Sequence, residues 1–475
     1  MSNKPTPKPN KSKKTVSAIK TGSFERRLSL TKAGLMVGTK MAGHMTSSLF
    51  SSKEKKAESR KRVLSEQAIF LVGELSKLKG SVVKIGQVMA LYGEHFLPPE
   101  VTEALHTLEE HTLPLEWPII HEALLSELGE SKLSGLDIEK TPIGTASLGQ
   151  VHKAVIKTTG EVICLKVQYP GVAKAIDSDL DGVAQLLKLA RIVSFGPAFD
   201  DWLEEVRTMM HREVNYILEA ETTARFSDML KNDSRFVVPS VYFDYSTNIV
   251  LATSFESGEN ISNAKVSKLS QARRDNLSKA ALSLFLEELF VWHEIQTDPN
   301  FGNYRIRISE SDELDKIVLL DFGAVQKYPA QFINPVCQMI CSSFNENVEG
   351  VIKGGIELHF MKEDWPQSVL NEFASVCIAV LEPLARNKPL AGSESFNASG
   401  EYCWKKSDLP TRIARRAAMS AISRYFKVPP KEFVFLNRKL VGVYTFISVL
   451  DGQFDGDVIL APYVETFLKQ SKLSN

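Results

Sequence analysis

The sequence has few cysteines and no long uncharged apolar run, and these absences set its first limits. Five cysteines in 475 residues are too sparse for a disulfide framework, so a reducing, cytoplasmic setting is the simplest expectation. Two of them, Cys337 and Cys341, lie four residues apart on an expected helix and are interpreted as core residues rather than metal ligands. No uncharged apolar stretch reaches the roughly 18 residues of a membrane span, and the start of the chain lacks the apolar segment of a signal peptide. We therefore expect neither a transmembrane helix nor a signal peptide.

Net charge is also absent, because 57 basic residues balance 57 acidic ones. A balanced chain has no global field that attracts nucleic acid, so no nucleic-acid partner is expected. The first 24 residues nevertheless hold six lysines and no acid, which indicates a basic, disordered tail. Residues 24–50 mix apolar residues with Arg and Lys, and fit either an amphipathic helix on an anionic membrane or a helix packed on the protein. Any peripheral contact with the inner face of the cytoplasmic membrane is expected through residues 1–50.

Changes in residue pattern divide the chain into four expected parts. A hydrophobic content of 43% over this length predicts a large core shared among several domains or lobes. The expected parts are the tail (1–64), a helical segment (65–140), a strand-containing lobe with a helical insertion (141–260) and a mostly helical lobe (261–475).

Alternating apolar and polar residues predict two strands over 148–157 and 161–168, joined by a turn at Thr159 and Gly160. The other expected elements are helices over 65–94 and 173–230, strands over 238–246 and 248–257, and a hairpin of 303–308 with 316–322.

The stretch QTDPNFGNY, residues 296–304, places Asp298 and Asn303 five positions apart. Pro299 and Gly302 between them predict a loop. Both polar residues could be turn residues that bond their own backbone, and Asp298 could cap a short helix. A functional role gains weight only from the order of the other polar residues along the chain.

A turn of small residues and a strand lysine precede this loop. The turn consists of Gly144, Thr145, Ala146 and Ser147. Small residues let backbone N–H groups approach phosphate oxygens, and Lys166 in the following strand can hold the α- and β-phosphates of ATP. A helix carboxylate is expected to fix the lysine ammonium, with Glu213 as the first candidate and Glu219 as the second.

Oxygen-bearing side chains in the loop and after it predict a magnesium site. Mg²⁺ prefers oxygen ligands, and Asn303 and Asp321 are the candidates. Asp298 would then face the position where a hydroxyl or a water attacks the γ-phosphate, as base or water-orienting residue. Each feature alone has an ordinary alternative. The segment D-F-G (321–323), which begins with Asp321, also suits a turn after a buried strand, and Lys166 could be solvated. Their joint order predicts a protein-kinase-like fold with ATP and Mg²⁺ as cofactors.

The sequence also resembles the UbiB/AarF family of atypical kinases, which is associated with ubiquinone biosynthesis in bacteria and mitochondria. The stretches that carry the resemblance are KIGQ (84–87), PIGTASLGQVHKA (142–154), REVNYILEAE (212–221), and QTDPNFGNY (296–304) with LLDFGA (319–324). They match the family's K-x-G-Q signature, its alanine-rich loop, its E-x-D helix with the following Glu, and its catalytic and metal-binding loops. The resemblance runs from about Leu71 to Tyr444.

The resemblance implies an α+β, two-lobed protein-kinase-like fold with a helical N-terminal extension across the active-site cleft. Lys84 and Gln87 would lie over the nucleotide site and restrict substrate access, and their i, i+3 spacing on one helix face permits this. Without the resemblance they would be a solvated pair. It further implies that Lys166 pairs with Glu213, and that Asp298 is the catalytic-loop aspartate.

Several positions depart from the family pattern. Gly144 and Thr145 stand where the family has alanines, which puts nucleotide preference and autophosphorylation in question, and Asn215 replaces the Asp of E-x-D. No Arg precedes Asp298 and no A-P-E follows D-F-G, so control by activation-loop phosphorylation is not expected. The paired C-terminal membrane helices of some bacterial members are absent from this sequence.

The expected function is that of a Mg-ATP-dependent ATPase or small-molecule or lipid kinase that supports isoprenoid-quinone biosynthesis, with a lipid or quinone precursor as partner. The main alternative is a nucleotide-switched pseudokinase that binds lipid quinone intermediates or protein partners without significant phosphotransfer. An ordinary Ser/Thr kinase and an aminoglycoside-type phosphotransferase are further alternatives, and neither explains KIGQ.

Overall fold

A computed structural model describes most of the chain after residue 80. The described residues are isolated positions between 62 and 73, then 81–92, 97–106, 114–146, 148–189, 196–311, 314–388, 391–413, 415 and 431–473. The basic tail and the segment 24–50 lie outside them. The chain forms two compact units: unit 1 comprises the described residues up to Glu221 together with Ser240–Phe255, and unit 2 comprises Thr222–Pro239 and Glu256–Asn475.

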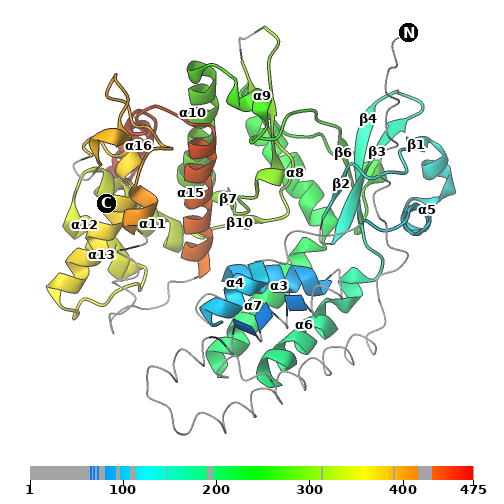
Figure 1. Ribbon diagram of the computed structural model, residues 1–475, viewed down its shortest axis with the longest axis horizontal. Helices are drawn as coiled ribbons and strands as arrows, with labels where there is room; N and C mark the ends of the chain where they lie inside the picture. Colours follow the sequence, from blue (N-terminus) through cyan, green and yellow to red (C-terminus); the bar gives the residue numbers. More distant parts are fainter. Residues whose placement is uncertain are drawn as a thin grey trace, which may run out of the picture. The chain divides into compact units, whose positions relative to one another are not determined.

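Unit 1 contains a five-stranded antiparallel sheet (Figure 1). Its strands are β1 (Leu136–Ile138), β2 (Gly144–Thr145), β3 (Gly149–Ile156), β4 (Val162–Gln168) and β6 (Val250–Ser254). The order is β1-β3-β4-β6, and β2 also pairs with β3. Strands β3 and β4 confirm the two strands that the alternating pattern predicts, and Gly160 adopts a φ of 75° in the turn between them.

The alternation along β4 separates its two faces. Ile163, Leu165 and Val167 are each 0% exposed, whereas Cys164 and Lys166 between them are half-buried. Successive strand residues point to opposite sides of a sheet, so one face supplies the apolar core and the other presents the lysine.

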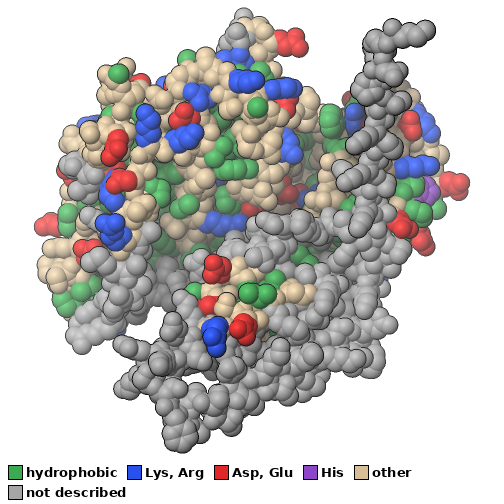
Figure 2. Space-filling view, viewed as in Figure 1, with side chains coloured by type: hydrophobic (Ala, Val, Ile, Leu, Met, Phe, Trp, Pro, Cys, Tyr) green, Lys and Arg blue, Asp and Glu red, His purple; other side chains and the backbone are tan. Residues whose placement is uncertain are grey.

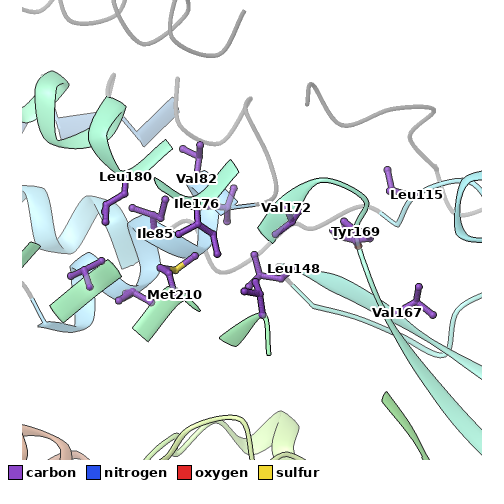
Figure 3. Packing of buried hydrophobic residues seen from close by; sticks show 14 of the residues in the cluster. Val82, Ile85, Leu115, Leu148, Val167, Tyr169, Val172, Ile176, Leu180 and Met210 are labelled. Carbon is purple, nitrogen blue, oxygen red and sulfur yellow. The ribbon is translucent and has the colours of Figure 1, made fainter. Parts of the chain in front are cut away.

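Helices complete unit 1. They are α3 (Ser81–Tyr92), α4 (Pro99–His106), α5 (Trp117–Ser134), α6 (Val172–Leu189), α7 (Pro197–Glu213) and the first residues of α8 (Tyr216–Leu230). Figure 3 shows Val82 and Ile85 of α3 beside Ile176 and Leu180 of α6, with Met210 of α7 close by. Apolar residues spaced four apart along α6 form the stripe that packs into this core.

Unit 2 is mostly helical. Its helices are α9 (Ala264–Ser267), α10 (Gln271–Glu287), α11 (Ala330–Phe344), α12 (Val348–Glu357), α13 (Gln367–Val380), α15 (Lys431–Val449) and α16 (Asp457–Leu473). Single turns are η3 (Glu288–Trp292, π-helical), η4 (Phe301–Asn303), η5 (Glu382–Leu384) and η6 (Ser393–Ser395). Helices α10 and α15 lie side by side (Figure 1).

Two small sheets in unit 2 hold the predicted loops. One sheet has the order β5-β9-β8, with β5 (Phe236–Val237), β8 (Tyr304–Arg307) and β9 (Lys316–Leu319), and the other pairs β7 (Glu294–Gln296) with β10 (Val325–Lys327). The antiparallel β8–β9 pair confirms the hairpin expected between 303–308 and 316–322.

The strand expected over 238–246 is wrong. Only Val241 makes an isolated bridge, to Thr253 of β6, and the chain then forms the 3₁₀ turn η2 (Phe243–Tyr245). Pro239 cannot donate a ladder hydrogen bond, and the N–H of Tyr245 donates to the carbonyl of Tyr242 at 3.0 Å instead.

Cys337 and Cys341 of α11 are buried in the apolar core of unit 2, as expected for core residues. Burial raises the pKa of the Cys341 thiol to about 12, so this side chain stays protonated at neutral pH. Across the described residues, no three His, Cys, Asp or Glu side chains gather into a metal-binding group.

Basic and acidic side chains are interspersed on the described part of the face that Figure 2 shows, which agrees with the balanced composition. None of the helices that the structure describes has the length and apolar character needed to cross a membrane.

Candidate functional site

The sheet register of unit 1 places the small-residue turn and the strand lysine in one row. Gly144 of β2 pairs with Val151 of β3, Val151 pairs with Lys166 of β4, and Lys166 pairs with Leu251 of β6. Directly opposite residues of antiparallel strands share a face. Gly144 and Lys166 are therefore brought to the same face of the sheet.

Lys166 is fixed by Glu219, not by Glu213. The Lys166 Nζ lies 2.7 Å from Oε1 of Glu219 and 5.1 Å from the centre of the Tyr216 ring. The side chains of Lys166 and Glu219 are 21% and 5% exposed. The expected Lys166–Glu213 pair is therefore wrong, and the second candidate is the partner.

The reason lies in the break between two helices. Glu213 is the last residue of α7, and α8 starts at Tyr216, with Glu219 in its first turn. Glu213 instead pairs with Lys84 of α3 at 2.8 Å. Asn215 at the break accepts a hydrogen bond from the N–H of Leu218 at 3.1 Å, and so satisfies one of the otherwise unbonded N–H groups at the start of α8.

Helix α3 carries Lys84 and Gln87, both half-buried. It is also held at its first residue, because the hydroxyl of Ser81 bonds the carboxylate of Asp179 on α6, and both residues are buried. The pairing of Lys84 with Glu213 and the buried bond of Ser81 fix the helix within unit 1. The substrate-restricting role of Lys84 and Gln87 stays a prediction.

The small-residue turn continues the sheet. Gly144 and Thr145 form β2, and the N–H of Ala146 donates to the carbonyl of Gly149 at 2.8 Å; Ser147 lies outside the described residues. Sequence reasoning missed Gly149. A Cβ there would stand 2.5 Å from the carbonyl oxygen of Val167, so only glycine lets the two strands approach this closely.

The structure confirms the predicted loop before β8 in unit 2 and brings Asp298 and Asn303 into contact. Nδ2 of Asn303 donates to Oδ2 of Asp298 at 2.8 Å. The cap of η4 is Asn300, whose Oδ1 accepts from the N–H of Gly302 at 2.8 Å. Asp298 accepts only a long 3.4 Å bond from the N–H of Asn300, so capping is not its main role.

A cationic neighbour of Asp298 comes from far along the chain. Nη2 of Arg438 on α15 donates to Oδ1 of Asp298 at 3.1 Å. Sequence reasoning missed Arg438, because no local spacing links it to a loop 140 residues earlier. Arg438 lies only within the last part of the stretch, up to Tyr444, over which the sequence resembles the UbiB/AarF family.

The hairpin register joins Asn303 to the D-F-G segment. Tyr304 pairs with Leu319, and the N–H of Leu320 donates to the carbonyl of Asn303 at 2.9 Å. Asp321 follows directly, and its Oδ1 accepts from the N–H of Gly323 at 2.9 Å. The end of this hairpin thus gathers one carboxylate and one amide.

This donor set fits a magnesium ion. Mg²⁺ takes oxygen ligands, keeps several waters, and needs only one or two protein ligands beside phosphate oxygens. The amide nitrogen of Asn303 is already used on Asp298, which leaves its carbonyl oxygen as the end suited to a cation.

Thr297 ties the two loops together at the position where ordinary kinases carry an Arg. Its N–H and its hydroxyl both donate to the carbonyl of Ala324, at 2.9 and 2.8 Å. Strand β7 pairs with β10 beside it, with Gln296 opposite Val325. The segment before Asp298 and the segment after Asp321 are therefore hydrogen-bonded to each other.

A buried ion pair between α15 and η3 lies next to the loop of residues 296–304. Nζ of Lys439 on α15 lies 2.9 Å from Oε2 of Glu288, and these side chains are 5% and 1% exposed. Burial raises the pKa of Glu288, although Lys439 opposes the shift. Burial lowers the pKa of Lys439, but the charges of Glu288, Tyr304 and Asp298 outweigh it and the net shift is upward.

The phenylalanine of D-F-G contacts the helix that carries Glu219. The rings of Phe322 and Phe226 have centroids 4.8 Å apart, and Phe226 lies near the end of α8, within unit 2. Within unit 2, the D-F-G segment is thus packed against the second half of α8.

A family model described as the ABC1 atypical kinase-like domain matches residues 107–354. The chain is 29% identical to the probable serine/threonine-protein kinase abkA of Dictyostelium discoideum, over 96% of this chain and 81% of that protein. It is 28% identical to the atypical kinase COQ8, mitochondrial, of Schizosaccharomyces pombe, over 82% of this chain but only 61% of the relative's length.

Among solved structures, the complex of Rv3197 with erythromycin from Mycobacterium tuberculosis matches with a TM-score of 0.55 at 20% identity, and covers 85% of this chain and 97% of that one. This likeness concerns the fold alone, and the expected kinase-like architecture is supported by the family model. The family model covers more than half of the chain and includes the Lys166, Asp298, Asn303 and Asp321 positions. The chain belongs to the ABC1 family of atypical kinase-like proteins, the UbiB/AarF family.

Proposed function

We propose that the chain binds Mg-ATP and transfers or hydrolyses its γ-phosphoryl group as an atypical kinase or ATPase. The observation that carries this proposal is the hairpin end of unit 2. There a 2.8 Å side-chain bond joins Asn303 to Asp298, and a 2.9 Å backbone bond joins Asn303 to Leu320, the residue directly before Asp321. Phosphoryl transfer asks a protein mainly for positioning and charge, and these residues are of the types that supply both.

Each residue has one role in this proposal. Lys166, held by Glu219, would bind the α- and β-phosphates, and backbone N–H groups near Gly144 would approach them. Asn303 and Asp321 would hold Mg²⁺, which when bound neutralises charge on the β- and γ-phosphate oxygens. Asp298 would accept the proton of the attacking hydroxyl or orient the attacking water.

The cellular role that we propose is support of isoprenoid-quinone biosynthesis, with a lipid or a quinone precursor as substrate class. Membership of the UbiB/AarF family supports it, and so does the similarity to a relative named COQ8.

A second candidate is a nucleotide-switched binding protein without significant phosphotransfer. It is favoured by the state of Asp298, whose two carboxylate oxygens are engaged by Asn303 and Arg438. A base held on both oxygens must release one contact, or share it, before it can accept a proton from an incoming hydroxyl.

The deciding experiment measures phosphate release from Mg-ATP by the purified full chain, beside the Asp298→Asn variant. Each protein is assayed with and without anionic liposomes and a phenolic mimic of a quinone precursor. Stimulated turnover that disappears in the variant supports the kinase or ATPase. ATP binding with no turnover above the variant supports the switch.

Peripheral membrane contact through residues 1–50 is a separate proposal, motivated by the six lysines of the first 24 residues and the apolar residues of 24–50. Flotation of the full chain with anionic liposomes, compared with a chain lacking residues 1–50, tests it. Equal flotation of the two chains would refute it.

A further inference from the structure

The loop that carries Asp298 has no positive charge of its own. Residues 296–304 contain no Lys or Arg, and Thr297 fills the position directly before the aspartate. The cationic contact with the Asp298 carboxylate comes instead from Arg438, 3.1 Å away on α15.

The two ends of the Asp298 carboxylate are held by different elements. Oδ1 accepts from Nη2 of Arg438, and Oδ2 accepts from Nδ2 of Asn303 at 2.8 Å. A carboxylate bonded at both oxygens cannot rotate freely about its terminal torsion. Its orientation is therefore set jointly by the loop and by α15.

Helix α15 is a firm support for this contact. Lys439, the next residue, forms the buried 2.9 Å ion pair with Glu288, whose Oε1 also accepts from the N–H of Gln296 at 3.4 Å. One turn later, a Cβ on Gly442 would stand 2.2 Å from Cβ of Pro299, so the helix backbone touches the loop directly. Arg438 thus projects from a helix that approaches the loop directly at Gly442 and is linked to it through Glu288.

We propose that Arg438 is a positioning residue, which holds the Asp298 carboxylate in the orientation required for phosphoryl transfer. This inference rests on the proposed function of Asp298. A guanidinium suits the task because it is planar, stays charged at all relevant pH values, and donates in fixed directions. It orients the carboxylate without exchanging protons with it. A purely structural role, in which Arg438 only attaches α15 to the loop, is the competing explanation.

The test uses steady-state kinetics of Mg-ATP turnover by the full chain, with radiolabelled ATP so that slow variants are measurable. The variants are Arg438→Gln, Arg438→Lys, Asp298→Asn, and Arg438→Gln combined with Asp298→Asn. Asn437→Ala is the matched control, because Asn437 is the exposed neighbour of Arg438 on the same helix. Thermal melting and the Kd for ATP are measured for each protein.

We expect Arg438→Gln to lower kcat about 10- to 100-fold and to change KM for Mg-ATP less than about twofold, because misorientation affects the reaction more than nucleotide binding. Arg438→Lys should recover part of the loss, since it keeps the charge but not the planar geometry. In the Asp298→Asn background the Arg438→Gln change should have almost no further effect, because two residues that act through each other are not additive.

The results separate this inference from the function on which it rests. If wild type turns over ATP through Asp298 but Arg438→Gln leaves kcat unchanged or raises KM instead, the positioning role is refuted and the proposed function stands. The same conclusion follows if Arg438→Gln lowers kcat as much in the Asp298→Asn background as in wild type. If wild type shows no turnover above Asp298→Asn, the proposed function fails and the positioning role fails with it. A loss confined to the melting temperature would leave Arg438 a structural residue and refute the inference.

Discussion

The ammonium of Lys166 lies 2.7 Å from Oε1 of Glu219, and Glu219 is only 5% exposed. A nearly buried carboxylate depends on its partner far more than an exposed one, because removal of either charge leaves the other uncompensated. Glu213 forms a separate pair with Lys84 at 2.8 Å, and both of those side chains are more exposed than Glu219. The two pairs can therefore be tested independently.

Glu219→Gln should weaken ATP binding about tenfold or more, because Lys166 loses a charge-assisted bond that is worth roughly 1.5–3 kcal/mol. Glu213→Gln is the matched control and should change the Kd for ATP less than about threefold. Titration with a fluorescent ATP analogue measures both. A larger effect for Glu213→Gln than for Glu219→Gln would show that Glu213, not Glu219, supports nucleotide binding by Lys166.

Lys439→Met should destabilise unit 2 by about 3–5 kcal/mol, because it leaves the carboxylate of Glu288, 1% exposed, without its cation. Adding Glu288→Gln should restore a large part of the loss, since the second change removes the uncompensated charge. Urea unfolding followed by circular dichroism measures the three proteins.

Lys353→Met is the control for loss of a lysine in the same unit. Lys353 is 78% exposed and lies 4.0 Å from Glu357, so its removal should cost less than about 0.5 kcal/mol. Equal destabilisation by Lys439→Met and Lys353→Met would contradict the buried pair.

Much of the fold and of the local site chemistry follows from the sequence, because the signals are short-range. Alternation predicts β3 and β4, and the Pro and Gly of QTDPNFGNY predict a loop that brings Asp298 within 2.8 Å of Asn303. The family resemblance supplies the order of the parts. These features depend on residues that are near one another in the chain.

The features that sequence reasoning missed depend on distant residues or on a helix break. The choice between Glu213 and Glu219 depends on where α7 ends and α8 begins, and helix boundaries are the least reliable part of pattern analysis. Arg438 reaches Asp298 from 140 residues away, and no periodicity encodes such a contact. Gly149 is required by the approach of a neighbouring strand, which the sequence does not display.

The stability of unit 1 should fall between pH 7 and pH 5 because of His152. This side chain is 0% exposed, its Nδ1 lies 2.8 Å from the carbonyl of Glu139, and its Nε2 lies 2.9 Å from Nε2 of Gln150. Burial lowers the pKa of His152 below its ordinary 6.5. As the pH falls, His152 of the unfolded chain therefore takes up a proton before His152 of the folded chain does. The contribution of neutral His152 to the stability of unit 1 is complete above pH 6.5 and is lost as the pH falls toward the lowered pKa.

His152→Gln should flatten the pH dependence of the free energy of unfolding. The difference in slope should be up to about 1.4 kcal/mol for each pH unit between the pKa of His152 in the unfolded chain and its lowered pKa in the folded chain. Melting temperatures of wild type and variant at intervals from pH 7.5 to pH 5 measure it, and His359→Gln, a change at an exposed histidine, is the control. Parallel curves for wild type and His152→Gln would show that His152 does not titrate as its burial requires.

In the proposed function Asp321 binds the metal and Asp298 serves the chemical step. We would measure Mg²⁺-dependent ATP binding and phosphate release in Asp321→Asn and Asp298→Asn side by side. Asp321→Asn should abolish Mg²⁺-dependent binding, because a neutral amide is a poorer magnesium ligand than a carboxylate. Asp298→Asn should keep binding and lower turnover by about 10²- to 10⁴-fold. Equal loss of ATP binding in both variants, or turnover that persists in Asp298→Asn, would contradict this division of roles between Asp321 and Asp298.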